Sequence, residues 1–238
     1  MKTHDFMATG EAIAPGTVRI ERLLPGPAER LWNYLTDSEK RRLWLAAGGM
    51  ELFPGGKVEL LFRHRELSSE PTPDRYKHYE TSPAMVSEVI ECDPPRLITY
   101  SWPGDGGKSE VTFELFPEGS NVRLVLTHRR LEGAEIMISV ASGWEAHLGI
   151  LEDRLSGREP RGFWSTHARL EREYAKKNSR SGGDGGIHAG TSNLVSARDP
   201  LGCRSTQIPP KRRACCPRPG RAAGAGPGLK TTHLRQLC

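Results

Sequence analysis

Residues 109–128 read SEVTFELFPEGSNVRLVLTH, the clearest secondary-structure signal in the chain. Apolar and polar side chains alternate on both sides of the Pro-Glu-Gly-Ser run at 117–120, which is typical of a tight turn. Such alternation predicts two antiparallel strands with one buried face. The predicted inner face carries Val111, Phe113, Leu115, Val122, Leu124 and Leu126, and His128 is next in line.

Further strand-like segments precede this hairpin, and glycine and proline turns separate them. We expect strands over residues 17–23, 50–53, 57–63, 84–91 and 96–102, in addition to 109–116 and 121–128. Val58, Leu60 and Phe62 alternate onto the inner face. The polar segment from His64 to Ser82 interrupts the series, and we expect it to be a mobile loop. The turn-like connections favour an antiparallel sheet.

Helical periodicity follows the first strand and returns after the last one. Two short helices are predicted after residue 26, the first with Pro27 in its first turn and the second capped by Asp37 or Ser38 and ending at Gly48. The longest helix has an apolar face formed by Ile136, Val140, Trp144, His147, Leu148, Leu151 and Leu155. Residues 158–162 interrupt it, and a further amphipathic segment carries Phe163, His167, Leu170 and Tyr174.

These elements predict an α+β domain over residues 16–177, in which a curved antiparallel sheet of six to seven strands wraps around a long C-terminal helix. We expect residues 1–15 to be flexible and 178–238 to be a disordered basic tail. The tail is rich in glycine, proline and arginine, and it cannot bury enough apolar surface to offset about 1–2 kcal/mol of ordering cost per residue. Its abrupt change in residue usage is also what a shifted reading frame would produce.

The charge of the chain divides at the same boundary. Residues 179–238 carry ten basic and two acidic side chains, whereas the first 178 residues carry 24 and 27. The formal net charge of +5 therefore belongs to the tail, and nucleic acid is an unlikely partner of the domain. Four of the five cysteines also lie in the tail, without zinc-ligand spacing. We expect a cytoplasmic protein without a membrane span, metal or cofactor.

Several local strings resemble one branch of a known superfamily. They are Pro27–Trp32 with Leu35–Asp37, then Trp44, Phe53–Gly56, Val86–Trp102, Val111–Leu115, Leu124–His128 and Gly143–Trp144 with the leucines after it. In this order, over roughly residues 16–157, they resemble the helix-grip (SRPBCC, START-like) superfamily, in the branch similar to the activator of heat-shock-protein-90 ATPase. The resemblance implies a deep cavity between the concave sheet face and the long helix. It implies no particular reaction, because one fold hosts many functions.

The predicted inner faces supply the candidate ligand-binding residues. An apolar pocket with a few polar groups is typical of small-molecule sites. The candidates are Trp44, Phe62, Tyr100, Trp102, Phe113, His128, Trp144, His147 and Leu148. The same side chains would serve equally as plain core.

Catalytic candidates are fewer. Across the predicted cavity, His128 and His147 would form either an acid–base pair or two metal ligands that lack a third. Local hydrogen bonding explains each of them more simply. Glu88 is expected at an exposed edge, and Arg22 at a strand end where it reaches solvent. No nucleophile elbow, phosphate loop or dinucleotide motif is present.

Three functions remain open from the sequence. The first is binding of a hydrophobic or aromatic small molecule. The second is an enzyme of the cyclase or hydrolase type that uses His128 or His147 as its base. The third is an interaction module for a chaperone or another protein partner.

Overall fold

The computed structural model describes residues 11–14, 16–104 and 107–181, which all lie in one compact unit. The predicted tail beyond residue 181 lies outside the described residues. Two predicted boundaries are wrong by a few residues. Residues 11–14 form a strand instead of belonging to a flexible terminus, because their backbone pairs with the next strand. The last helix continues to Ser181, past the predicted end of the domain.

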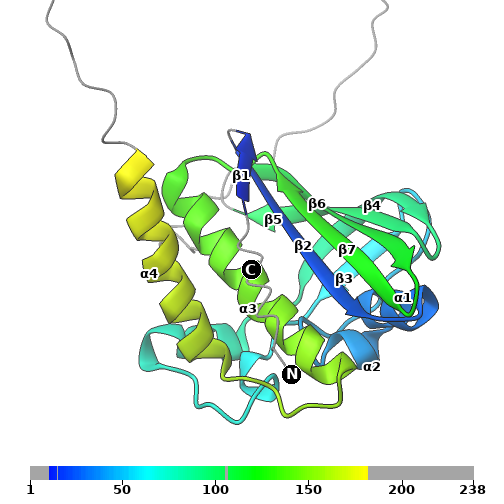
Figure 1. The fold of residues 1–238 in the computed structure, drawn as a ribbon, viewed down its shortest axis with the longest axis horizontal. Helices are drawn as coiled ribbons and strands as arrows, with labels where there is room; N and C mark the ends of the chain where they lie inside the picture. The colour runs from blue at the N-terminus through cyan, green and yellow to red at the C-terminus, as the bar shows by residue number, and fades with distance from the viewer. Residues whose placement is uncertain (1–10, 15, 105–106, 182–238) are drawn as a thin grey trace, which may run out of the picture. The chain divides into compact units, whose positions relative to one another are not determined.

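The sheet has seven strands, and every pairing in it is antiparallel. Its spatial order is β1-β2-β7-β6-β5-β4-β3, so the early strand β2 pairs with the last strand β7 (Figure 1). The strands are β1 (Glu11–Ala14), β2 (Thr17–Pro25), β3 (Lys57–Leu60), β4 (Met85–Asp93), β5 (Leu97–Gly104), β6 (Gly107–Glu118) and β7 (Asn121–Arg129).

The register of β6 and β7 confirms the predicted inner face. Phe113 lies opposite Leu126, and Val111 lies opposite His128. These four side chains are at most 2% exposed, because alternation turns them all toward the helix side of the sheet. The outer face of β4 carries exposed Val86, Glu88 and Ile90, as expected for Glu88.

Two short helices connect β2 to β3. Helix α1 (Ala28–Thr36) buries Ala28, Leu31, Trp32 and Leu35, as the periodicity predicts. Asp37 then caps α2 (Ser38–Arg41) by accepting a hydrogen bond from the Lys40 backbone N–H. The second helix is shorter than predicted, and the chain continues as turns to Ala46.

The long helix α3 (Ala134–Leu155) packs against the inner face of the sheet, and α4 (Phe163–Ser181) lies beside α3 (Figure 1). The chain reverses between them around Asp153, whose carboxylate accepts hydrogen bonds from Arg158 and from both the side chain and backbone of Arg161. Burial alone would raise the pKa of Asp153, but the hydrogen bonds and charge of the two arginines outweigh it and lower that pKa to about 2.

Two predictions between β2 and β4 are wrong. The expected strand at 50–53 is only a bridge between Met50 and Val58, because the chain turns at once into Pro54 and Gly55. The expected mobile loop contains two 3₁₀ helices, η1 (His64–Glu66) and η2 (Asp74–Thr81), and Leu67 is buried. This segment also caps α4, since the Glu70 carboxylate accepts hydrogen bonds from the Ser165 backbone N–H.

Among the described residues, no helix is both long and apolar enough to cross a membrane.

Candidate functional site

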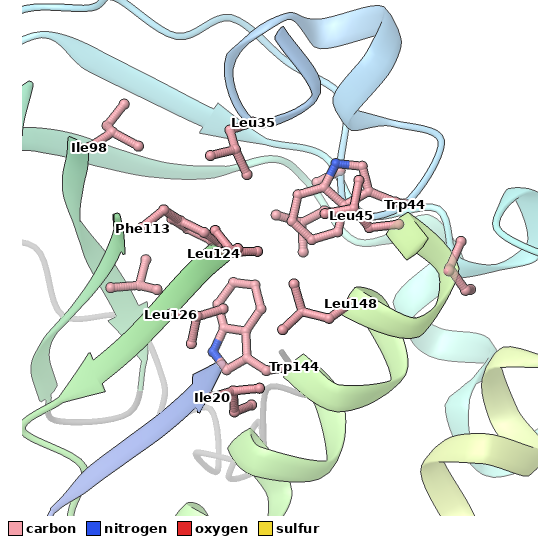
Figure 2. Close-up of a cluster of buried hydrophobic side chains, with 14 of the residues drawn as sticks. Ile20, Leu35, Trp44, Leu45, Ile98, Phe113, Leu124, Leu126, Trp144 and Leu148 are labelled. Atoms are coloured by element: carbon pink, nitrogen blue, oxygen red, sulfur yellow. The ribbon is translucent and has the colours of Figure 1, made fainter. Parts of the chain in front are cut away.

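All nine side chains predicted to bind a ligand come together between the sheet and α3, and every one is at most 9% exposed. We call this set the aromatic interior: Trp44, Phe62, Tyr100, Trp102, Phe113, His128, Trp144, His147 and Leu148. Figure 2 shows Trp144 pointing from α3 toward Phe113 and Leu126 of the sheet, with Leu148 one helical turn further along. The sequence thus identified which side chains converge.

The rings of the aromatic interior contact one another mainly edge to face. Trp144 lies 5.1 Å from Trp102 and 5.6 Å from Phe113 between ring centroids, with interplanar angles of 63° and 82°. Phe62 extends the set outward, at 6.0 Å from Trp102 and 6.3 Å from His147. At 9%, Phe62 is the most exposed of the nine, so it marks the edge of the interior. T-shaped contacts of this kind fix ring orientation as well as bury area.

The segment that carries Trp44 is held in place by a buried arginine. The Arg41 guanidinium is fully buried and donates hydrogen bonds to four backbone carbonyls, those of Thr36, Ala46, Gly48 and Glu59. Burial lowers the pKa of Arg41 below its ordinary value. The Trp44 indole N–H donates to the Tyr34 carbonyl at 2.8 Å, which orients its ring toward Phe113. These four hydrogen bonds hold the segment between α2 and β3 around the buried guanidinium.

His128 has a defined tautomer. The Trp144 indole N–H donates to His128 Nδ1 at 3.0 Å, and an indole nitrogen can only donate. Nδ1 therefore carries a lone pair, and the neutral ring has its proton on Nε2. Burial lowers the pKa of His128 to about 3, so the ring is uncharged at neutral pH. This arrangement favours a hydrogen-bond donor over a general base.

His147 has the opposite tautomer, with its proton on Nδ1. Its Nδ1 lies 2.7 Å from the Trp44 backbone carbonyl, which only accepts, so Nδ1 carries the proton of the neutral ring. The lone pair then lies on Nε2. Separate partners thus orient the two imidazoles: the Trp144 indole orients His128, and the Trp44 carbonyl orients His147.

A second group of aromatic side chains, which we call the α4 cluster, lies next to His147. It consists of His64 from η1, Tyr76 from η2, and Phe163, Trp164 and His167 from α4. The His64 ring is 5.6 Å from His147 and 4.9 Å from Phe163, and Tyr76 stacks on Trp164 at 4.5 Å and 10°. Arg75 lies over the Tyr76 ring and pairs with Glu171 of α4.

The histidines of the α4 cluster are buried and neutral. Burial, together with the nearby His147 and His167, lowers the pKa of His64 well below 6.5. Burial also lowers the pKa of His167, where Glu171 raises it and Arg75 lowers it further. Sequence reasoning missed His64 as a site residue, although it follows Val58, Leu60 and Phe62 at the same two-residue spacing. His167 belonged to a predicted helical face, but nothing local showed what it contacts.

A buried ion pair ties the sheet to both long helices. Arg22 of β2 pairs with Glu145 of α3, whose other carboxylate oxygen lies 3.3 Å from the Tyr174 hydroxyl of α4. The Arg22 side chain is only 14% exposed, so the expectation that it reaches solvent is wrong. The reason is that Glu145 lies within reach across the sheet–helix interface.

No group of three or more His, Cys, Asp or Glu side chains in the described part of the chain could hold a metal ion. Cys92 is half-buried, and its pKa is raised by burial and by Asp93. It therefore lacks the electropositive surroundings of a reactive thiolate.

An antiparallel sheet that packs on one long helix, with aromatic residues between them, defines a helix-grip domain of the SRPBCC type. The sequence matches the family described as activator of Hsp90 ATPase homolog 1-like protein over residues 25–156. The chain belongs to this family. The match ends before α4 begins.

Solved structures agree with the fold. The solution NMR structure of a protein from Bordetella parapertussis has a TM-score of 0.63 and 42% sequence identity, and the match covers 71% of this chain and 89% of that one. The crystal structure of CalU16 from Micromonospora echinospora has a TM-score of 0.52 at 22% identity, covering 70% and 92% respectively. At 22% identity the likeness concerns the fold alone. The comparison with curated proteins gave no match.

Proposed function

We propose that the domain binds a small, largely apolar aromatic molecule in the aromatic interior. One observation carries the proposal. Two fully buried imidazoles, His128 from the sheet and His147 from α3, lie among aromatic rings on the inner faces of these elements. Burial of a polar group costs free energy, and a core built only of apolar side chains avoids this cost. An apolar wall with a few oriented polar groups is instead the usual composition of a ligand site.

The aromatic wall also indicates the shape of the ligand. Trp102, Phe113 and Trp144 present ring edges and faces at centroid separations of 5.1–5.6 Å. A planar ring can replace such contacts by intercalating or stacking, whereas a flexible alkyl chain loses more conformational entropy for the same area. Phe62, at the edge, is the side chain whose rotation would admit a ligand.

Methyl NMR on the full chain with labelled Ile, Leu and Val tests this proposal. We expect 2-acetylnaphthalene to shift the methyl signals of Val111, Leu126 and Leu148 and to raise the melting temperature. Val86 and Ile90, exposed on β4, are the internal control and should not move. Decanoate should give a smaller effect. Shifts confined to Val86 and Ile90, or an unchanged melting temperature at saturating probe, would exclude binding in the interior.

The orientation of His147 favours one second function, general-base catalysis on a bound ester. Its Nδ1–H is fixed by the Trp44 carbonyl, which leaves Nε2 as the basic atom. If this holds, 2-naphthyl acetate is hydrolysed faster than in buffer, and His147→Gln removes the acceleration while His128→Gln retains it. A wild-type rate equal to that of buffer would rule this function out.

A further inference from the structure

The Nε2–H of His128 is a hydrogen-bond donor in the aromatic interior whose burial the packing alone does not explain. The hydrogen bond from Trp144 to Nδ1 fixes the proton of the neutral ring on Nε2. Nε2 is buried and has no hydrogen-bond partner among the described residues. Its ring lies edge to face with Trp102 at 5.6 Å, and its strand neighbours are Val18 and Val111. A buried donor without an acceptor is destabilising, and none of these neighbours offers a side-chain acceptor.

We propose that the ligand of the aromatic interior is an aromatic ketone, or another uncharged aryl carbonyl compound, whose oxygen accepts a hydrogen bond from His128 Nε2. This inference rests on the proposed function and names the ligand class for the same site. His128 then selects for an acceptor, and Trp144 is the positioning residue that fixes the donor. A ligand that donates a hydrogen bond to His128 is disfavoured, because Nδ1 already accepts from Trp144 and Nε2 carries a proton.

The charges around the interior argue against a carboxylate ligand. The buried Arg41 directs its N–H groups to backbone carbonyls, and Arg22 is paired with Glu145. His128 is itself held neutral by burial. A carboxylate at His128 would therefore be buried without a matching cation, which is far more costly than burying a carbonyl. An uncharged acceptor fits the donor without this cost.

Three probes of similar shape separate these possibilities: 2-acetylnaphthalene, 2-isopropylnaphthalene and 2-naphthoate. We expect the ketone to bind about tenfold more tightly than the hydrocarbon, and the naphthoate to bind more weakly than the ketone at pH 7.5. In His128→Phe the advantage of the ketone should disappear while the hydrocarbon still binds. Phe113→Leu is the matched control, which should weaken ketone and hydrocarbon equally.

The outcomes distinguish this inference from the proposed function. Equal affinity for ketone and hydrocarbon, with both shifting the inner methyl signals, would leave binding intact and overturn the role of His128. No binding by any probe would overturn both. If His128→Phe does not fold, ¹⁵N-histidine spectra of the wild type decide: Nε2 must be protonated, and its signal must move with the ketone and stay with the hydrocarbon. An unprotonated Nε2 would contradict the proposal.

Discussion

At the scale of single residues, Asp153 shows how one carboxylate can hold a chain reversal. It accepts hydrogen bonds from two arginines that follow it by five and eight residues, so it fixes the turn from α3 to α4. Asp153→Asn should destabilise the domain by about 1–3 kcal/mol at pH 7, measured by urea unfolding. Glu152→Gln is the control, because Glu152 meets the same arginines at the surface, and it should cost less than about 1 kcal/mol.

The pH dependence of this effect follows from the pKa. Because the pKa of Asp153 is lower in the folded state than the ordinary 3.8, its contribution is fully present above about pH 4 and is lost as pH falls toward 2. The stability difference between wild type and Asp153→Asn should shrink over that range. A difference that stays constant down to pH 2 would show that the carboxylate charge is not the cause.

At the scale of elements, Glu145 joins β2, α3 and α4 through Arg22 and Tyr174. Glu145→Gln should cost about 3–5 kcal/mol, because it leaves a largely buried guanidinium without its countercharge. Arg22→Met with Glu145→Leu should be less destabilising than the sum of the two single changes, because both charges leave together. Urea unfolding of the wild type, Arg22→Met, Glu145→Leu and the double variant gives the coupling free energy. Strict additivity would mean that the two side chains do not interact.

The α4 cluster predicts a loss of stability in mild acid. The pKa values of His64 and His167 are lower in the folded state, so their neutral forms are compatible with burial above about pH 6.5. As pH falls below 6.5 the unfolded chain binds protons first, and stability should fall by up to about 1.4 kcal/mol per histidine for each pH unit. His147, Arg75 and Glu171 are the titratable groups that face them.

Urea unfolding at pH 7.5 and 5.5, followed by tryptophan fluorescence, measures this loss. His64→Phe with His167→Phe should reduce the pH dependence, and the part that remains belongs to His128, whose pKa burial also lowers. Replacement of the exposed His78 of η2 by Gln should leave the pH dependence unchanged. An equal pH dependence in wild type and the double variant would assign the acid sensitivity to other groups.

Local sequence patterns predicted the elements whose partners are close in the chain. Alternation along β6 and β7 identified the inner face, because a tight turn makes each strand the neighbour of the other. The same logic failed for residues 64–82. Glu70 contacts Ser165 and Tyr76 stacks on Trp164, and both partners lie some 90 residues further along the chain. The polar composition of residues 64–82 therefore gave no sign that this segment packs against α4. The convergence of the aromatic side chains was predictable, but the Trp144–His128 hydrogen bond and the proton positions depend on the three-dimensional structure.

At the largest scale, the apolar core of the described residues runs along the sequence from Val18 to Trp164, with Tyr174 packed against it. Deletion of residues 182–238 should therefore leave the melting temperature within about 1 °C of the full chain. It removes nine basic and two acidic residues and changes the formal net charge from +5 to −2, so retention on a cation exchanger should be lost. A fall in melting temperature of several degrees would show that the tail contributes to folding.

The pairing of β2 with β7 has a consequence for synthesis. Val18 of β2 lies opposite His128 of β7, so the first inner strand forms its main pairing with residues made about a hundred positions later. At about 5–20 residues per second, β2 would wait roughly 5–20 s on the ribosome before its partner exists. During this interval its apolar face is open to chaperones and to other nascent chains. The order of the strands thus delays completion of the sheet until late in translation.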